Sequence, residues 1–176
     1  MDDEDASPKR DPENLGPRPP VQNDLVALCR ELNQRGARYV VVGGFAIIAA
    51  GFARLTGVID LLVAADPENE AKVFSALSKL PDNKVKELWP GELNQYMVLR
   101  VGDEIIVDLM RMAGGIDCVE AAKDIVVHEL DGISIPFASP RSLWRMKANT
   151  HRAKEEQDLL FLRHWFAERG EQPPDS

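Results

Sequence analysis

The sequence is poor in cysteine, in aromatic residues and in long apolar runs, and each shortage excludes a class of protein. Its 176 residues include two cysteines, with no CxxC or Cys/His cluster, which excludes a zinc or disulfide scaffold. No apolar run approaches the roughly 18 residues of a membrane span, and the acidic N-terminus lacks the apolar stretch of a signal peptide. We therefore expect a cytoplasmic protein with no membrane partner.

Aromatic residues make up 6% of the chain. Several of them follow helical spacing in the apolar C-terminal stretch, the pattern of a packed core rather than of a platform on which bases stack. The formal net charge of −8 also argues against a general nucleic-acid binder. The charge is segregated, because segment 141–154 holds five bases and no acid. These bases are Arg141, Arg145, Lys147, Arg152 and Lys154.

Composition divides the chain into a folded part and two tails. Residues 1–20 are rich in Pro, Asp and Glu, and we expect a disordered acidic tail there. Residues 168–176 form a second predicted tail. Residues 21–167 suit one domain, since 44% of the chain is hydrophobic and a domain of this length can bury a core.

Hydrophobic patterning predicts helices alternating with strands in the first half of the domain. Leucines near residues 25–32 follow helical spacing, and β-branched runs at 38–42 and 58–63 predict two buried strands. Gly43-Gly44 ends the first strand, and a short helix over 45–53 follows. Asp66-Pro67 is an N-cap with proline at the first helical position, so a third helix begins there.

Turn residues predict two hairpins in the second half. Gly102-Asp103 separates apolar runs at 94–101 and 104–112, and Asp131-Gly132 separates runs at 124–130 and 133–137. Ser139-Pro140 opens a helical segment that Asn149-Thr150 can break in two. If that segment is one continuous helix, Lys147 and Asp158 lie on one face of it. The order of elements indicates an α+β fold with a mixed sheet and a helical C-terminal segment.

Two aspartates in apolar strands need an explanation. Asp60 lies in "VIDLLV" and Asp108 in "IIVDLM". If these strands are neighbours, the two carboxylates converge and repel unless a cation lies between them. Mg²⁺ uses one or two carboxylates together with phosphate oxygens, and Gly43-Gly44 offers backbone N–H groups to a phosphate. The pattern points to metal-assisted phosphoryl or nucleotidyl transfer, but a plain tight turn and a solvent-facing Asp108 stay open as alternatives.

The stretch "VVGGFAIIAAGFARLTGVIDLLV" resembles the opening motif of the nucleotidyltransferase (polymerase-beta-like) superfamily. It is most similar to small bacterial nucleotidyltransferase toxins of the abortive-infection type. Gly43, Gly44, Arg54, Thr56 and Asp60 fall in register with that motif, and Asp108 matches an aspartate on a later strand. "LWRMKANTHRAKEEQDLLFL" is similar to the C-terminal motif of the family, with Lys147, Arg152, Lys154 and Asp158 in place. The resemblance covers residues 21–167 and implies a mixed β-sheet flanked by helices.

The resemblance also implies a set of roles. Asp60 and Asp108 would be catalytic and would hold Mg²⁺, with Mn²⁺ as the alternative. The nucleotide would be bound by Gly43, Gly44, Arg54, Thr56, Lys147, Arg152 and Lys154. Such a protein would transfer an NMP from an NTP to RNA, for instance tRNA, or to a protein. The setting implied is phage defence or a toxin–antitoxin pair, with an antitoxin as partner.

The chain departs from the family at Val58, where the first carboxylate of the Asp-x-Asp motif would stand. Three accounts are open: an inactive relative that keeps the nucleotide pocket, a substitute oxygen from Glu104 or Asp103, or a degenerate or engineered change in an active lineage. The functional alternatives are therefore an active nucleotidyltransferase and an inactive regulator that binds nucleotide or protein. A third reading is a structural partner protein that uses its basic segment.

Overall fold

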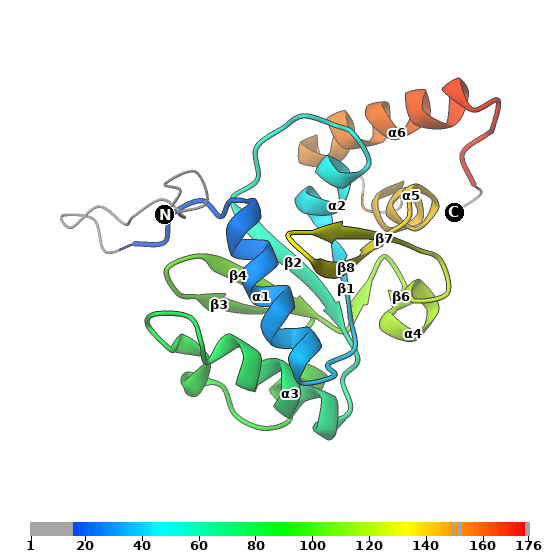
Figure 1. Cartoon of the computed structure of the whole chain (residues 1–176). Coiled ribbons are helices and arrows are strands. Elements are labelled where there is room, and N and C mark those ends of the chain that lie inside the picture. Colours follow the sequence, from blue (N-terminus) through cyan, green and yellow to red (C-terminus); the bar gives the residue numbers. More distant parts are fainter. Residues whose placement is uncertain (1–15, 149, 151–152, 175–176) are drawn as a thin grey trace, which may run out of the picture.

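The computed structural model describes residues 16–148, 150 and 153–174 (Figure 1). The helices are α1 (Gln22–Gln34), α2 (Gly43–Ala49), α3 (Pro67–Leu77), α4 (Cys118–Ala121), α5 (Pro140–Ala148) and α6 (Glu156–Glu168). Short 3-10 turns lie at η2 (Lys84–Glu87), η3 (Glu92–Asn94) and η4 (Ala153–Glu155). The strands are β1 (Tyr39–Val42), β2 (Val58–Val63), β3 (Leu99–Gly102), β4 (Ile106–Met110), β5 (Met112–Ala113), β6 (Ile116–Asp117), β7 (Ile125–Leu130) and β8 (Ile133–Ala138).

Six of the strands form one mixed sheet in the order β3-β4-β2-β1-β8-β7. Strand β2 runs parallel to β4 and antiparallel to β1, while β1 runs parallel to β8. The outer pairs β3–β4 and β7–β8 are antiparallel hairpins, and β5 pairs with β6 in a separate two-stranded ribbon. The predicted α+β class with a mixed sheet flanked by helices is confirmed.

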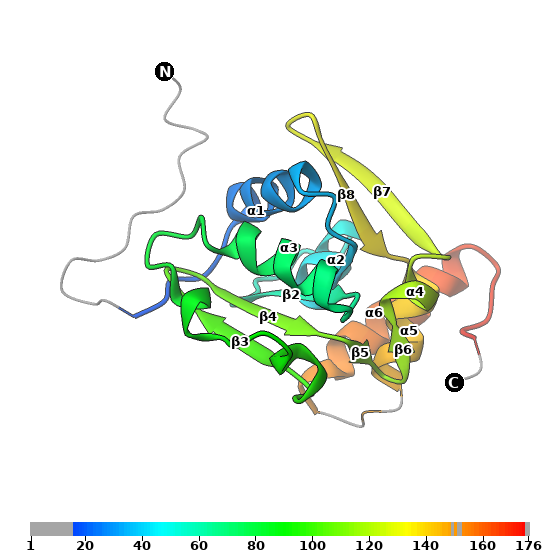
Figure 2. The ribbon, with the colours of Figure 1, turned by 90° about the horizontal axis from the view of Figure 1, so that it is seen from below.

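The helices form two groups around this sheet (Figures 1 and 2). Helices α1 and α3 contact one another, and α2, α5 and α6 form a second group in which α5 contacts both others. Strand β1 is buried along its whole length because it lies in the middle of the sheet. None of the helices in the described part of the chain has the length and apolar character that a membrane crossing requires.

Several local predictions are confirmed. Asp66 caps α3 by accepting a hydrogen bond from the Asn69 N–H at 3.1 Å. Asp131-Gly132 is the two-residue turn between β7 and β8, and both of its residues have positive φ. The C-terminal helical segment is indeed broken after Ala148, with the α5 and α6 helices on either side of the break.

Two predictions need correction, and one conditional expectation is decided. The first hairpin turns over residues 103–105, because Gly102 still pairs with Ile106 in the ladder. Gly43 and Gly44 do not form a turn before the helix but are its first two residues, and that helix ends at Ala49. The break after Ala148 means that Lys147 and Asp158 do not lie on one continuous helix.

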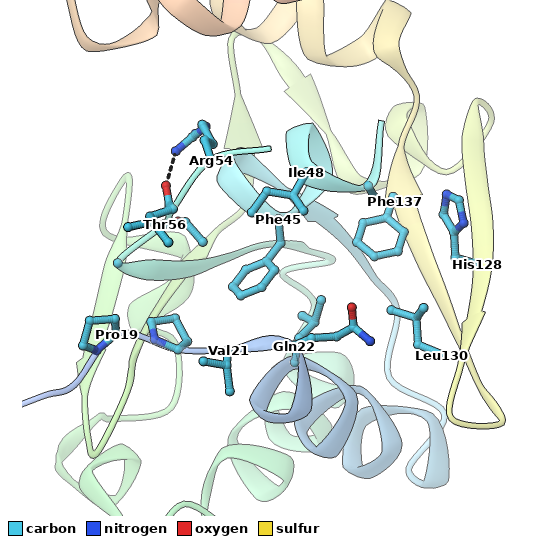
Figure 3. A pocket seen from close by; sticks show the side chains of 15 residues that line it. Pro19, Val21, Gln22, Phe45, Ile48, Arg54, Thr56, His128, Leu130 and Phe137 are labelled. Carbon is cyan, nitrogen blue, oxygen red and sulfur yellow. Dashed lines mark hydrogen bonds between the residues drawn. The ribbon is translucent and has the colours of Figure 1, made fainter. Parts of the chain in front are cut away.

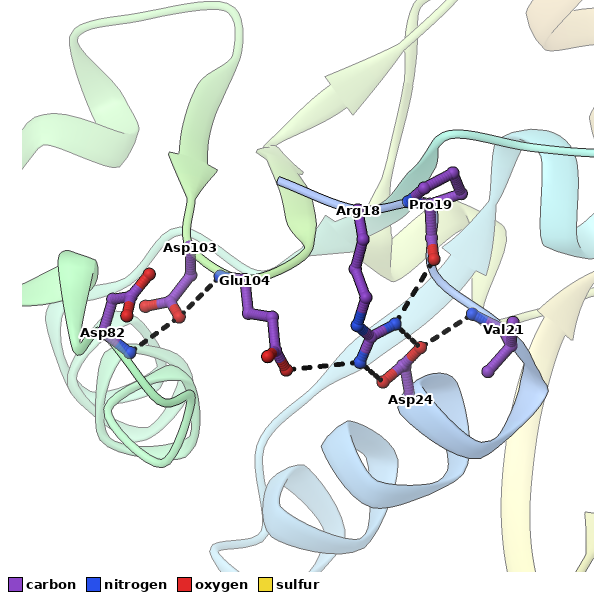
Figure 4. Close-up of polar contacts among 7 residues, drawn as sticks. All are labelled: Arg18, Pro19, Val21, Asp24, Asp82, Asp103 and Glu104. Carbon is purple, nitrogen blue, oxygen red and sulfur yellow. Dashed lines mark hydrogen bonds and ion pairs between the residues drawn. The ribbon is translucent and has the colours of Figure 1, made fainter. Parts of the chain in front are cut away.

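The predicted tails are described only in part. Residues 1–15 and 175–176 lie outside the described residues, so disorder there stays a prediction. Residues 16–20 of the predicted N-terminal tail are described, and Arg18 is anchored against α1. Its guanidinium donates to both carboxylate oxygens of Asp24, at 2.9 and 2.8 Å (Figure 4).

Candidate functional site

A cleft of about 490 Å³ lies between the C-terminal helices and strands β2, β3 and β4. Its lining combines segments that are far apart in the sequence: the start of α2, residues 54–60, residues 97–100, the end of β4, and parts of α5 and α6. The predicted site residues among this lining are Gly43, Gly44, Arg54, Thr56, Asp60, Asp108 and Lys147. The fold therefore brings together seven of the nine residues that the sequence singled out.

The two aspartates lie on neighbouring strands. Asp60 of β2 and Asp108 of β4 are partners in the parallel ladder, so both side chains point from the same face of the sheet. Ile59 and Leu61 point from the opposite face into the core and are fully buried. Asp108 is only 7% exposed. Two adjacent carboxylates with limited access to water repel one another, so this part of the cleft favours a cation.

The two glycines leave space for site side chains. A Cβ atom added to Gly43 would lie 2.1 Å from the Oδ2 atom of Asp60, and the φ of Gly43 is +65°. A Cβ atom on Gly44 would lie 2.5 Å from Oγ1 of Thr56 and 3.2 Å from a guanidinium nitrogen of Arg54. Glycine is required at both positions because the neighbouring side chains take up the space that a Cβ atom would need.

Sequence reasoning missed Arg100, a base of the cleft lining that pairs with Asp108. Its Nε and Nη2 groups donate to the two oxygens of Asp108, at 2.9 and 3.0 Å. This hydrogen bonding raises the pKa of Arg100 above its ordinary value, and the charge of Asp60 acts in the same direction. The Arg100 side chain is 61% exposed, so it reaches Asp108 from the solvent side of the cleft.

A second polar group is centred on Asp158 of α6. The Arg54 guanidinium lies 2.9 Å from Oδ1 of Asp158, and Nζ of Lys147 lies 3.2 Å from Oδ2. Lys147 is also 3.8 Å from Glu155. Asp158 is 3% exposed, so the pairing with both bases satisfies a carboxylate that would otherwise be buried at a high cost. Asp158 thereby fixes two of the predicted nucleotide-binding residues on one wall of the cleft.

Two predicted site residues are not placed in the cleft by the described structure. Arg152 lies outside the described residues, and Lys154 belongs to η4 without a described side chain. The sequence positions on either side of them, Thr150 and Glu155, both line the cleft.

The donors present fit one divalent cation but not a pair. Asp60 and Asp108 offer oxygens from adjacent strands, which suits Mg²⁺ bound by one or two carboxylates and by phosphate. Val58 lines the same cleft and has no oxygen in its side chain. Within the described residues, no group of three or more His, Cys, Asp or Glu side chains could hold a metal ion. Among the described residues, a two-ion site of the kind that the sequence resemblance implies therefore lacks a ligand.

The proposed substitutes for that ligand point elsewhere (Figure 4). The Asp103 carboxylate accepts hydrogen bonds from the backbone N–H groups of Asp82, Lys84 and Glu104, at 2.8 to 2.9 Å. The Glu104 carboxylate accepts from Arg18 at 3.3 Å. Neither residue lines the cleft. The contacts of Asp103 and Glu104 therefore do not support the account in which one of them replaces the missing carboxylate.

The charges of the described lining nearly cancel. Three bases, Arg54, Arg100 and Lys147, face four acids, Asp60, Asp108, Glu155 and Asp158, which gives a net of −1. A free triphosphate would meet repulsion here, whereas a triphosphate that carries Mg²⁺ brings its own counter-charge.

A second cavity of about 630 Å³ is lined in part by residues 54–57 (Figure 3). Its walls are mostly apolar side chains of the α1 start, α2 and the β7–β8 hairpin, among them Phe45, Ile48 and Phe137. Arg54 and Thr56 line both cavities, so one short segment separates them.

Comparison with known proteins gives a fold-level result. No family model and no curated protein matches the chain. Among solved structures, an antigenic nucleotidyltransferase-like protein from Paracoccidioides brasiliensis is similar, with 16% identity and a TM-score of 0.51, over 80% of this chain and 74% of that one. A candidate nucleotidyltransferase from Thermotoga maritima has 18% identity and a TM-score of 0.46, over 86% of this chain and 98% of that one. The mixed sheet and the likeness to the Paracoccidioides brasiliensis protein together indicate a nucleotidyltransferase-like fold.

Proposed function

We propose that the protein binds a nucleoside triphosphate as its Mg²⁺ complex in the cleft formed by β2, β4, α5 and α6. The observation that carries the proposal is the convergence of the predicted residues: Arg54 and Asp60 of segment 54–60, Asp108 of β4 and Lys147 of α5 line one cavity. A volume of about 490 Å³ lies within the range of ordinary ligand sites.

Each charged residue has a role in this proposal. Asp60 and Asp108 would hold a single Mg²⁺, or Mn²⁺ in its place, and that ion would neutralise part of the triphosphate charge. Arg54 and Lys147, which Asp158 holds in position, would face the phosphates. The exposed Arg100 side chain would turn from Asp108 toward the ligand as the ion binds. Arg152 and Lys154, which the resemblance also assigns to the nucleotide, follow Lys147 by five and seven positions in the sequence.

Transfer of the nucleotide is the second candidate function. It is favoured by the placement of Asp60 opposite Asp108, the positions that the superfamily resemblance assigns to catalysis. Loss of one transition-state contact commonly costs about 3–4 kcal/mol, or a factor of roughly 10²–10³ in rate. With Val58 in place of a carboxylate, we infer that nucleotide binding is kept while transfer is slow or lost.

The wider setting follows from the resemblance alone. An active protein would pass an NMP to RNA, such as tRNA, or to a protein, within a toxin–antitoxin or phage-defence system and under the control of an antitoxin. An inactive one would act as a regulator that signals nucleotide occupancy to a partner. The two settings differ in one measurable respect, which is covalent transfer.

One labelled nucleotide tests binding and transfer together. Equilibrium dialysis of the full chain against Mg²⁺ and α-³²P-labelled NTPs measures binding, and a denaturing gel of the same sample, with and without a tRNA pool, measures transfer. We expect binding by the wild type, loss of binding in Asp60→Ala, and covalent label in Val58→Asp. Absence of binding to every NTP would refute the proposal, and label transferred by the wild type would establish the second candidate.

A further inference from the structure

The methionines of this chain are concentrated at the candidate site. The sequence has five, and Met1 lies outside the described residues. The other four, Met97, Met110, Met112 and Met146, all line the cleft. They come from four different parts of the chain: the segment before β3, the end of β4, β5, and α5. We call these four side chains the methionine wall.

The wall and the charged groups occupy successive positions along the same strands. On β4, Met110 follows Asp108 by two residues and therefore points from the same face of the sheet. Val98, just before β3, and Arg100, within β3, are likewise two residues apart, and both line the cleft. On α5, Met146 directly precedes Lys147. The cleft thus has a charged part around Asp108 and an apolar part beside it.

Two side chains of the methionine wall are exposed, so the rest of the described fold leaves much of their surface uncovered. Met97 is 69% exposed and Met112 is 42% exposed, while Met146 is buried. Exposed apolar side chains beside a charged site are typical of a binding surface. Methionine is unbranched and polarizable, it adapts to irregular shapes, and its sulfur makes favourable contacts with aromatic rings.

Resting on the proposed function, we propose that the methionine wall receives the nucleobase while the charged part receives the Mg²⁺–triphosphate. We further propose that the wall does so with little discrimination among bases. The thioether is a weak acceptor and donates no hydrogen bond, so these side chains cannot recognise the edge of a base. Sites that recognise a ligand by hydrogen bonds discriminate by about 10⁴-fold or more, whereas apolar pockets reach roughly 10- to 200-fold. The affinities for ATP, GTP, CTP and UTP should therefore differ by less than about 200-fold.

Methyl NMR tests the position of the base directly. In the full chain labelled with [methyl-¹³C]methionine, the five methyl signals are assigned by single Met→Leu substitutions. Mg²⁺–ATP should shift the signals of Met97 and Met112, because the ring current of the base acts on nearby methyl groups, and should leave Met1 unchanged. Mg²⁺–tripolyphosphate, which has no base, should bind without these shifts.

Affinity measurements give the complementary result. Met97→Ala and Met112→Ala should each weaken ATP binding several-fold and leave tripolyphosphate binding unchanged. Leu160→Ala is the matched control, since Leu160 is an exposed apolar residue of α6 that does not line the cleft. ATP binding without methionine shifts, or a preference above about 200-fold for one base, would overturn this inference and leave the proposed function intact. If neither ATP nor tripolyphosphate binds, both fail.

Discussion

Removal of Arg100 should increase the affinity of the cleft for a divalent cation. In the wild type, a cation that approaches Asp108 competes with a guanidinium that makes two hydrogen bonds with it. A pair of this exposure contributes about 1 kcal/mol or less, because Arg100 is 61% exposed and water screens its charge. Repulsion between the Arg100 charge and a divalent ion about 5 Å away adds up to ~1.5 kcal/mol in a water-like medium. Arg100→Ala should therefore bind the ion roughly 5- to 30-fold more tightly.

The assay is a Mn²⁺ titration without nucleotide at pH 7 and low salt, in which the EPR signal of free Mn²⁺ reports binding. Arg141→Ala is the matched control, because Arg141 is a similarly exposed arginine paired with an acid, Glu171, outside the cleft. The gain should disappear in the double variant Arg100→Ala/Asp108→Asn. Equal Mn²⁺ affinity in Arg100→Ala and the wild type would refute the reasoning that Arg100 competes with the cation for Asp108.

Further predictions concern stability and reactivity. Asp158→Asn should lower the free energy of unfolding by about 3–5 kcal/mol, because it leaves the buried Lys147 poorly paired. Urea denaturation measures this difference, and a loss below about 1 kcal/mol would contradict the prediction. Gly43→Ala should destabilise the protein and abolish ligand binding, whereas Gly57→Ala, with no atom within 4 Å of its added Cβ, should do neither. The pKa of Asp66 is lowered, mainly because its carboxylate accepts a hydrogen bond from the Asn69 N–H. Its contribution to stability is therefore present above the unfolded pKa of about 4 and is lost as the pH falls through the lower pKa of the folded state. In acid unfolding, the difference in free energy of unfolding between wild type and Asp66→Ala should shrink over that pH range. Burial raises the pKa of Cys29 to about 12, so this thiol should resist alkylation at pH 8 until the protein unfolds, as mass spectrometry would show.

Much of the site follows from short-range rules in the sequence. The alternation of side chains along a strand places Asp60 and Asp108 on the faces they occupy, and the apolar neighbours of each identify buried strands. Turn chemistry at Asp131-Gly132 and the cap at Asp66 are decided by residues a few positions apart. Such features depend little on the rest of the fold, and for that reason they could be predicted.

The role of Arg100 depended on a register that turn chemistry did not reveal. A two-residue turn at Gly102-Asp103 would pair Arg100 with Ile105. The observed turn over 103–105 pairs it with Asp108 instead. Asp103 favours the observed turn because its buried carboxylate binds three backbone N–H groups, two of them from a distant segment. That tertiary contact has no local signal, so the cation beside the aspartates could not be recognised from the sequence.

The network around Asp158 was missed for a related reason. Reasoning from one continuous helix places Lys147 and Asp158 on one face, but the chain breaks after Ala148 and the two residues belong to different helices. They nevertheless meet at 3.2 Å, since α5 and α6 pack together and Arg54 approaches from the other side. Helical periodicity holds within one helix only, so a contact between two helices depends on packing that the sequence pattern does not encode.

The central claim is that the cleft binds a nucleoside triphosphate through Asp60 and Asp108. Calorimetric titration of the full chain with Mg²⁺–ATP, beside Asp108→Asn, tests it most directly. The account predicts one ATP bound per chain, with an affinity at least about tenfold weaker in Asp108→Asn, because the ion loses one of its two carboxylates. Absence of binding, or equal binding by both proteins, would contradict it.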